Sequence, residues 1–596
     1  MNPEIANAFR LLQSGDALQA AAVCRDLLKR NPDNGHVMQL LGVSLRKLGN
    51  FEEAEQHLRR SVELSPANAE FRTNLAQLLG ARGKHEQSAG EFRSAVALDA
   101  RFRPALNGLA RAAARLLRYE EAERAARTLV ALKESDSEAW VLLGSVLHGA
   151  GRWPQARQAM ERAAKLAPKH APTRGRLAAL LCDQEHAEAV LAQVAEAGRL
   201  GLADRALTMS QARALMQLDR YEEAEAVLAP LVAAAPADTE SQFLLVQLRH
   251  VRGDPDFARA LREAAARPDA APPIRLLLAD VLRRAGQAAA AEHMLRTMVG
   301  AYGPHPGLLG SLGALLQESG RFAEALDLTR QAAASQPEDV TAAENFVAAA
   351  LCAGDPQVAL PTIERFAQRT PTDQRWITYR ADVARQRGED LYAQWCDLDR
   401  VVQVFDIEPP PGYSSLEEFH AAVRPALEAR HRQKSHPLDQ SLRHGTQTSR
   451  GLLVGDDPLI RALLDAMADP IARYQSAMLR EEAHPLYRRN VAPARMVGCW
   501  SVRLQRGGFH VNHIHPQGWI SSAYYVSVPA EVADTSLRSG WIKFGEPRFP
   551  TPACEAGRFV QPKPGRLVLF PSYLWHGTTP IHGDEPRLTI AFDAAP

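Results

Sequence analysis

The sequence predicts a multidomain protein in which an all-α superhelix of repeated helix pairs is followed by a smaller β domain with flanking helices. Three observations predict this fold class. Sequence markers recur every 34 residues up to about residue 400, a proline-rich stretch lies at 406–412, and strand-like alternation begins near residue 496. We therefore expect a repeat array over 1–405, a linker over 406–412 and the β domain over 413–596.

The repeat is marked by a small residue that lies five positions after a turn glycine. This position is occupied by Ala20, Ala54, Ser88, Ala122, Ala156, Val190, Ala224, Ala258, Ala291, Ala325 and Ala359, and every step is 34 residues except one of 33. The glycine ends the first helix, the small residue lets the two helices approach, and a proline twelve residues later stops the second helix. A 34-residue period with these markers is the tetratricopeptide pattern. We expect about eleven repeats plus closing helices, with the poorest fit at 171–203 and 255–275.

Repeats of this kind predict a protein or peptide as binding partner. One helix pair cannot bury its apolar face alone, so neighbouring pairs stack into a superhelix with a concave surface. We expect the periodic residues to lie in the core, and the polar side chains of the concave helices to contact the partner.

Composition argues against several other classes of protein. Lys and Arg total 70 against 69 Asp and Glu, so a net charge of +1 gives no reason to expect nucleic acid or an anionic membrane as partner. No apolar run reaches the roughly 18 residues of a membrane span, and the first ten residues do not resemble a signal peptide. The six cysteines are scattered and are expected to be reduced, which is typical of a cytoplasmic protein.

Histidines near the end of the chain predict a metal site. His513 and His515 are two residues apart, so in an extended segment they point to the same face. His576 closes a second strand-like run 63 residues after His513, and Arg587 opens a third run eleven residues later. Imidazole suits Fe, Zn, Cu and Ni, and a facial set of ligands with open positions is typical of non-haem Fe(II) oxygenases. The arginine suggests an anionic co-ligand.

The region from about 412 to 596 resembles a bacterial 2-oxoglutarate/Fe(II)-dependent dioxygenase of the prolyl/aspartyl-hydroxylase-like, double-stranded β-helix (jelly-roll) type. The resemblance is carried by 513–516, 521–526, 540–544, 563–571, His576 and 587–590. It implies that His513 is the first iron ligand and His576 the distal one. It also implies that Arg587 pairs with the distal carboxylate of 2-oxoglutarate, because its planar fork matches a carboxylate bidentately.

Two further residues are candidates for contact with 2-oxoglutarate. The resemblance implies this role for Tyr525, and a place in the barrel core is the alternative. Thr589 lies two residues after Arg587 and therefore shares its face, so its hydroxyl is a second candidate donor to the same carboxylate.

The sequence departs from the usual His-x-Asp/Glu motif, because His515 stands at the carboxylate position. Two interpretations remain open. In the first, His515 is a neutral third metal ligand. In the second, iron uses only His513 and His576, as related aspartyl/asparaginyl hydroxylases do, and His515 either contacts a metal ligand without binding the metal or faces the substrate.

The combination predicts a 2-oxoglutarate- and Fe(II)-dependent dioxygenase that hydroxylates a protein or peptide side chain recruited by the tetratricopeptide array. No catalytic residue is expected beyond the metal and co-substrate ligands. The first alternative is a non-catalytic interaction scaffold with a degenerate jelly-roll domain. The second is a three-histidine, cupin-like dioxygenase that does not use 2-oxoglutarate.

Overall fold

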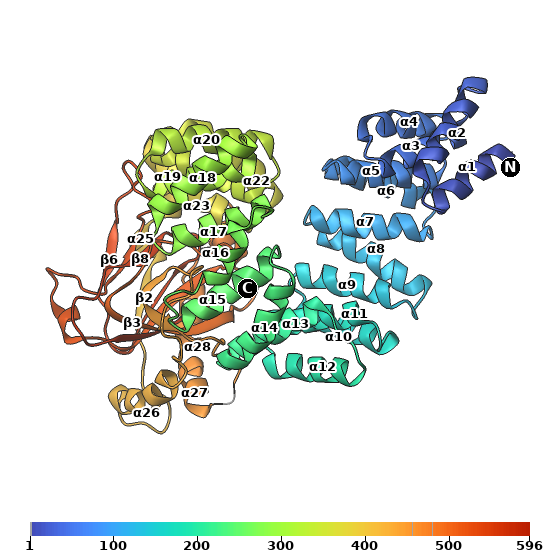
Figure 1. Ribbon diagram of the computed structural model, residues 1–596. Helices are drawn as coiled ribbons and strands as arrows, with labels where there is room; N and C mark the ends of the chain where they lie inside the picture. The colour runs from blue at the N-terminus through green and yellow to red at the C-terminus, as the bar shows by residue number, and fades with distance from the viewer. Residues whose placement is uncertain (1–2, 456, 480) are drawn as a thin grey trace. The chain divides into compact units, whose positions relative to one another are not determined.

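The computed structural model describes residues 3–455, 457–479 and 481–596, and the chain folds into two compact units (Figure 1). The first unit comprises Met1–Gln184 and Glu188–Ser210, and the second comprises Glu185–Ala187 and Gln211–Pro596. The second unit therefore holds both the later repeats and the whole β domain. The boundary between the two compact units therefore lies within the repeats and not at 406–412.

The first unit is built from antiparallel helix pairs in chain order. Its helices are α1 (Pro3–Gln13), α2 (Ala17–Arg30), α3 (Gly35–Lys47), α4 (Phe51–Leu64), α5 (Ala69–Ala81), α6 (His85–Leu98), α7 (Arg103–Arg115), α8 (Tyr119–Leu132), α9 (Ser137–Gly149), α10 (Trp153–Leu166), α11 (Ala171–Asp183) and α12 (Ala187–Arg199). Within a pair the turn residue has positive φ, as Gly49 does at +82°, which is why glycine recurs there. At 171–203, where the fit to the repeat is poorest, α11 and α12 are continuous helices, but Glu185 takes the place of the turn glycine with φ of +57° and the boundary between the two units runs through this turn.

The same pairing continues in the second unit. After α13 (Arg205–Gln217), whose residues are shared between the units, it contains α14 (Tyr221–Ala234), α15 (Thr239–Val251), α16 (Arg259–Ala266), α17 (Pro272–Arg284), α18 (Ala288–Tyr302), α19 (Pro306–Glu318), α20 (Phe322–Ser335), α21 (Val340–Cys352), α22 (Pro356–Arg369) and α23 (Gln374–Arg387). Helix α16 has only 8 residues, since turns replace helix around Pro255. The expected irregularity near 255–275 is therefore confirmed.

The segment after α23 differs from the expectation that it is helical as far as residue 405. It forms α24 (Asp390–Trp395), α25 (Leu398–Val401) and then strand β1 (Gln403–Asp406), which pairs antiparallel with β7. Helix α26 (Leu416–Glu428) is capped by Ser415, whose hydroxyl accepts a hydrogen bond from the backbone N–H of Glu418. The amphipathic pattern over 457–479 predicts one helix, but the segment forms two, α27 (Pro458–Ala466) and α28 (Ala468–Ser476).

The β domain consists of two antiparallel sheets in a jelly-roll-like arrangement. The larger sheet has the strand order β1-β7-β4-β9-β3-β2 and the smaller has the order β6-β5-β8. The remaining elements are β2 (Leu442–Gln447), η1 (Tyr487–Arg489), β3 (Arg495–His510), β4 (Ile520–Ser527), η2 (Ala530–Ala533), β5 (Ile542–Phe544), β6 (Arg558–Val560), β7 (Arg566–Pro571), β8 (His576–Thr578) and β9 (Arg587–Ala595). Buried residues of both sheets and of α26–α28 form one core.

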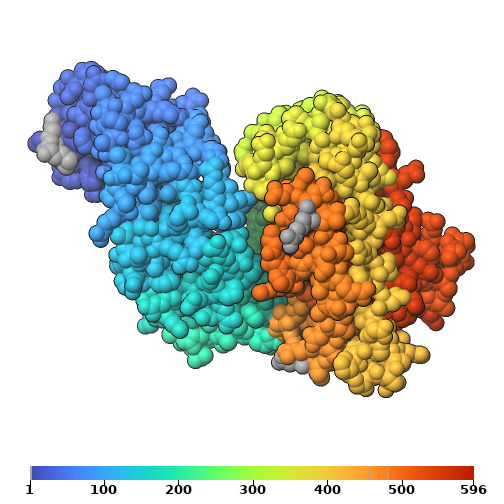
Figure 2. All heavy atoms as spheres, turned by 180° about the vertical axis from the view of Figure 1, so that it is seen from behind, coloured from blue at the N-terminus to red at the C-terminus, as the bar shows by residue number. Residues whose placement is uncertain are grey.

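Helix α23 joins the repeats to the β domain by direct hydrogen bonds. The backbone N–H of Gln374 donates to the Pro516 carbonyl at 2.9 Å, and the Thr378 hydroxyl donates to the Tyr573 carbonyl at 2.6 Å. In Figure 2 the yellow surface of the last repeats is continuous with the orange and red surface of the β domain. Trp575 belongs to the hydrophobic core of the repeats. The last repeat therefore supports the two segments that carry His515 and His576.

No helix in the described part of the chain is both long enough and apolar enough to cross a lipid bilayer.

Candidate metal and carboxylate site

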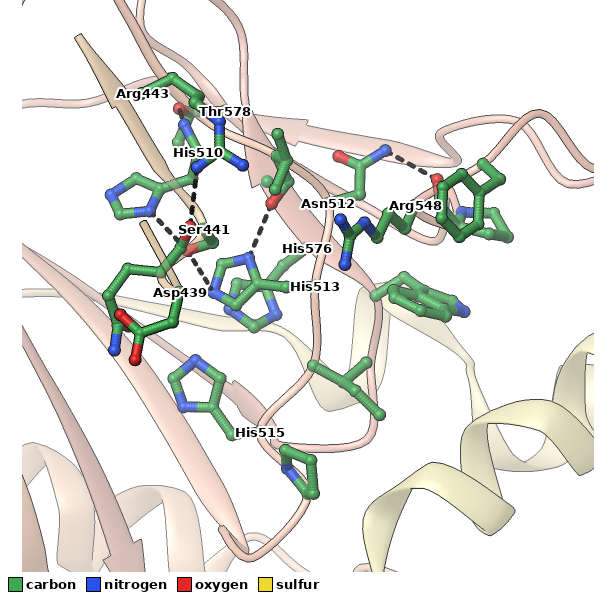
Figure 3. A pocket seen from close by; sticks show the side chains of 18 of the residues that line it. Asp439, Ser441, Arg443, His510, Asn512, His513, His515, Arg548, His576 and Thr578 are labelled. Atoms are coloured by element: carbon green, nitrogen blue, oxygen red, sulfur yellow. Dashed lines mark hydrogen bonds between the residues drawn. The ribbon is translucent and has the colours of Figure 1, made fainter. Parts of the chain in front are cut away.

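The three predicted histidines lie close together in one cavity (Figure 3). His513 and His515 lie on the segment between β3 and β4 and not on a strand, which differs from expectation. The segment is nevertheless extended at His513, because His513 forms an antiparallel bridge with His576 at the start of β8. The ligand atoms of His513, His515 and His576 all lie within 4.8 Å of one another. The arrangement has the size of a site for one metal ion.

Backbone carbonyls fix the orientation of two of these imidazoles. The Nδ1 of His513 lies 2.8 Å from the Val511 carbonyl, and the Nδ1 of His576 lies 2.9 Å from the Leu574 carbonyl. A carbonyl only accepts hydrogen bonds, so each Nδ1 carries the proton and each Nε2 carries a lone pair, which in His513 faces the Ser441 hydroxyl. Burial lowers the pKa of His513 to about 3, and burial and the neighbouring His513 hold the pKa of His576 well below its ordinary value. Both rings are therefore neutral and able to bind a metal.

A carboxylate orients the third imidazole. The Nδ1 of His515 lies 2.6 and 2.7 Å from the two carboxylate oxygens of Asp593 on β9. Asp593 also accepts a hydrogen bond of 2.7 Å from the Ser521 hydroxyl, its partner in the register of β4 and β9. A carboxylate behind a histidine fixes its tautomer and raises its basicity as a ligand.

Sequence reasoning missed Asp593. A signal was present, because Arg587 and Asp593 are an even number of residues apart and therefore share one face of β9. Glu531, Asp534 and Glu546 lack the sequence spacing of a carboxylate ligand, and among the described residues they bond to Ser539, Ser536 and Lys543 and not to the three histidines.

Ser441 connects the histidine cluster to a fourth imidazole. Its hydroxyl lies 3.0 Å from the Nδ1 of His510 and 3.3 Å from the Nε2 of His513. His510 ends β3 and its backbone N–H donates to the Thr578 hydroxyl at 2.9 Å. It lines the cavity and is half-buried.

Arg587, Tyr525 and Thr589 line the same cavity, which has a volume of about 1220 Å³. Arg587 is only 2% exposed, donates a hydrogen bond to the Gly540 carbonyl, and lies over the Tyr525 ring at 5.6 Å from the centroid. The Thr589 hydroxyl donates to the Val502 carbonyl at 3.3 Å. Burial raises the pKa of Tyr525 to about 12, with Arg587 opposing the shift, so the phenol is neutral and can donate a hydrogen bond.

Two buried donors at this place lack a partner among the described residues. They are the Nε of Arg587 and the hydroxyl of Tyr525. No carboxylate in the described part of the chain forms an ion pair with Arg587, and an unpaired buried cation is costly. The residues therefore fit a small ligand that brings a carboxylate to Arg587 and Tyr525. The three imidazoles beside them fit a divalent metal ion of the kind that imidazole prefers.

Comparison with known proteins gives matches to two families. A family model described as "Putative 2OG-Fe(II) oxygenase" matches residues 498–593. Two tetratricopeptide repeat models match residues 11–78 and residues 107–171, 209–273, 276–340 and 311–374. No curated protein matches the sequence.

Solved structures of tetratricopeptide proteins are similar to parts of the chain. A tetratricopeptide repeat protein from Parabacteroides merdae is 15% identical over 41% of this chain and 96% of its own, with a TM-score of 0.35. MamA is 20% identical over 27% of this chain and 95% of its own, with a TM-score of 0.26. YrrB, described as a TPR protein with an unusual peptide-binding site, is 17% identical over 30% of this chain and 93% of its own, with a TM-score of 0.27.

Proposed function

We propose, from the premise that this chain joins tetratricopeptide repeats to a 2OG-Fe(II) oxygenase domain, that it is a 2-oxoglutarate- and Fe(II)-dependent hydroxylase of a protein or peptide side chain. One observation carries the proposal. A single cavity holds three clustered imidazoles together with a buried arginine that has no carboxylate partner in the described part of the chain. This is the pair of binding sites that a metal ion and a dicarboxylate co-substrate require.

Each residue of the site has a definite role in this proposal. His513, His515 and His576 would hold Fe(II) through their Nε2 atoms. Arg587 would bind the distal carboxylate of 2-oxoglutarate, with a hydrogen bond from the Tyr525 hydroxyl. The Thr589 hydroxyl would add a second hydrogen bond by giving up the one that it donates to the Val502 carbonyl. When bound, Fe(II) and 2-oxoglutarate supply oxidative chemistry that no side chain of the protein provides.

The surrounding residues keep the site dry and orient its ligands. The Phe570 ring lies 4.6 Å from the His576 ring and packs edge-on against Phe544 at 4.9 Å. Both phenylalanines are at most 1% exposed. An apolar wall of this kind limits the access of water, while Asp593 holds His515 in the tautomer that leaves Nε2 free.

The experiment that tests the proposal measures iron binding and co-substrate turnover separately. We expect the full chain to bind Fe(II) anaerobically near one equivalent and to release succinate slowly from 2-oxoglutarate in air. His513→Ala and His576→Ala should abolish both, whereas His582→Ala should change neither, because His582 is exposed and lies outside the cavity. Absence of Fe(II) binding by the unmodified chain would favour the scaffold.

Arg587 distinguishes a 2-oxoglutarate enzyme from a three-histidine dioxygenase. Arg587→Ala should weaken 2-oxoglutarate binding by roughly 10-fold or more, since truncating one partner of a buried charge pair costs at least about 2 kcal/mol. Iron affinity should stay close to that of the wild type. Arg566→Ala is the matched control, because Arg566 lies on β7 and pairs with Asp406 at 3.1 Å outside the cavity. Unchanged 2-oxoglutarate binding in Arg587→Ala would contradict this assignment.

We assign His515 as the third ligand because Asp593 holds its Nδ1 and one of its ring nitrogens lies within 4.8 Å of the ligand atoms of His513 and His576. His515→Ala should raise the Kd for Fe(II) at least about 10-fold, which is the usual cost of losing even an outer-sphere partner of a metal ligand. A change below about threefold would rule out ligation and restrict iron to His513 and His576.

A further inference from the structure

The wall of the cavity opposite the β domain is built from the repeats. Four helices of the second unit, α17, α19, α21 and α23, contribute lining residues. Two rows of equivalent repeat positions recur there at 34-residue spacing, namely Arg283, Gln317 and Leu351, and Ala314, Ala348 and Asp382. The repeat surface and the histidine cluster therefore belong to one cavity.

The shape of this wall suits the binding of an extended polypeptide. Equivalent positions on successive repeats lie in a row, and the small side chains of Ala314 and Ala348 leave room along it. Asn345 on α21 lines the cavity, is half-buried, and its side-chain amide has no hydrogen-bond partner among the described residues. An amide of this kind can donate to a peptide carbonyl and accept from a peptide N–H at the same time.

Most charged side chains of the cavity already have partners of opposite charge. Glu318 is paired with Arg283 and, at 3.3 Å, with Arg548, and Glu344 is paired with Arg375 at 3.1 Å. The carboxylate of Asp439 is exposed and lies on the opposite side of the histidines from Arg548 in Figure 3.

Besides Arg587, which is assigned to 2-oxoglutarate above, Arg443 is a cation of the cavity without a carboxylate partner among the described residues. It is half-buried and its Nη1 donates to the carbonyls of Gln440 and Leu442, each at 2.7 Å, and no carboxylate in the described part of the chain pairs with it. Burial, and then the charge of nearby Arg548, lower the pKa of Arg443. Figure 3 places its guanidinium beside His510, on the side of the cavity where Ser441 leads to His513.

We propose that the cleft between α17–α23 and the β domain binds an extended segment of a partner protein, and that an Asp or Glu of this segment pairs with Arg443 next to the residue held at the histidines. Asn345 bonds to the backbone of the same segment. The preference for an acidic sequence thus comes from Arg443 on β2 of the β domain, and the repeats of the second unit contribute the backbone contact at Asn345. The identity of the held residue as the target of hydroxylation rests on the proposed function, whereas the binding itself does not.

The test is a binding selection in the absence of Fe(II) and 2-oxoglutarate. The full chain is the target, and a displayed library of random twelve-residue peptides is selected for binding to it. We expect the selected peptides to be enriched in Asp and Glu. Synthetic copies should bind at least about 5-fold more tightly than versions with Asn and Gln in place of Asp and Glu, as one partly buried charge pair of about 1 kcal/mol predicts. Selection with no acidic enrichment, or no selected peptide at all, would overturn the proposal.

Variants locate the preference on the structure. Arg443→Gln should reduce the preference for the acidic peptide to below about twofold, and Arg443→Lys should keep most of it. Asn345→Ala should weaken the binding of the acidic peptide and of its version with Asn and Gln by the same factor. Arg506→Gln is the matched control, because Arg506 is exposed and pairs with Asp584 outside the cavity. An acidic preference that survives in Arg443→Gln would exclude Arg443 as the anion site.

The two proposals fail in different ways. If peptides bind with the acidic preference but 2-oxoglutarate is never consumed, only the proposed function is wrong. If 2-oxoglutarate is consumed but the peptides show no dependence on Arg443, only the acidic substrate class is wrong.

Discussion

Glu55 in the first unit and Asp382 in the second are both buried carboxylates on repeat helices, but their surroundings are opposite. Glu55 on α4 bonds to Arg59 at 2.8 Å and to Lys84 at 2.9 Å. Asp382 on α23 is 3% exposed, has no ion pair among the described residues, and accepts a hydrogen bond of 2.8 Å from the indole of Trp575. Alanine occupies the equivalent position in the two preceding repeats, at Ala314 and Ala348.

This difference shows how one repeat pattern serves two purposes. In the first unit the buried charge is compensated by neighbouring repeats, so it supports the stacking of helices. In the second unit a carboxylate is buried without a cation, which costs stability, and its bonded partner directly precedes His576. Residues that weaken a fold yet contact a binding site are a frequent mark of function.

The largest expected effect tests whether the last repeat is part of the site. Trp376 is 1% exposed and stacks on Phe366 at 4.7 Å, in the same core as Trp575. Trp376→Ala should lower the free energy of unfolding of the second unit by about 3–5 kcal/mol. It should also weaken Fe(II) binding, because the segment carrying His576 loses its support. Segment-resolved hydrogen exchange and anaerobic iron titration measure the two effects.

Phe71 provides the matched control in the first unit. Phe71 and Trp376 each lie twelve residues before the turn glycine of their repeat, and Phe71 is 2% exposed. Phe71→Ala should destabilise the first unit by a similar amount and leave iron affinity unchanged. If both variants weakened iron binding equally, the contrast between the units would be lost.

The second expected effect is a pH dependence due to Asp382. Burial raises the pKa of Asp382 to about 7, against the hydrogen bond from Trp575 and the charge of Arg385. Between pH 4 and 7 the folded state keeps a proton that the unfolded state releases, so the free energy of unfolding falls as pH rises. Asp382→Asn should remove this fall and be more stable than the wild type at pH 8, by at most roughly 4 kcal/mol. Parallel pH profiles of unfolding for the two proteins would refute the assignment.

The sequence predicts the repeats well because their signals are local. Glycine turns, small residues and prolines act within one helix pair, so spacing alone reveals them. The convergence of His513, His515 and His576 was also predicted, from alternation and from resemblance to a family. Asp593 and the strand β1 were missed because they depend on pairing between distant strands, Ser521 with Asp593 and β1 with β7. The contacts of α23 with the β domain were missed for the same reason, since no short-range pattern encodes a hydrogen bond from Gln374 to Pro516.

Glu55 should give a pH dependence of the opposite sign and smaller size. Burial raises the pKa of Glu55, but the hydrogen bonds from Lys84 and Arg59 outweigh it and lower the pKa to about 2. Its contribution to stability is therefore present above the unfolded pKa of 4.5 and is lost as pH falls towards 2. Glu55→Gln should destabilise the first unit by about 1–2 kcal/mol at pH 7, after allowance for solvent screening, and by little at pH 2. A loss of stability that does not depend on pH would show that Glu55 acts by packing alone.

The smallest expected effect concerns a turn in the first unit that lacks its glycine. Leu117 has φ of +60° and is 47% exposed, at the repeat position that Gly49 occupies with φ of +82°. The backbone hydrogen bonds match, because the N–H of residue 117 donates to Ala114 at 3.0 Å and that of residue 49 donates to Arg46 at 3.2 Å. A left-handed conformation costs a non-glycine residue about 1–2 kcal/mol, and the entropy of a new glycine offsets part of the gain. Leu117→Gly should therefore stabilise the first unit by up to about 1 kcal/mol, as measured by hydrogen exchange of α7 and α8.

Gly49→Leu is the reciprocal variant. Open space surrounds the position of its Cβ, so backbone strain alone should destabilise the unit by about 1 kcal/mol. If both substitutions stabilised the first unit, or both destabilised it, side-chain contacts and not the backbone conformation would decide which residue is preferred at this turn.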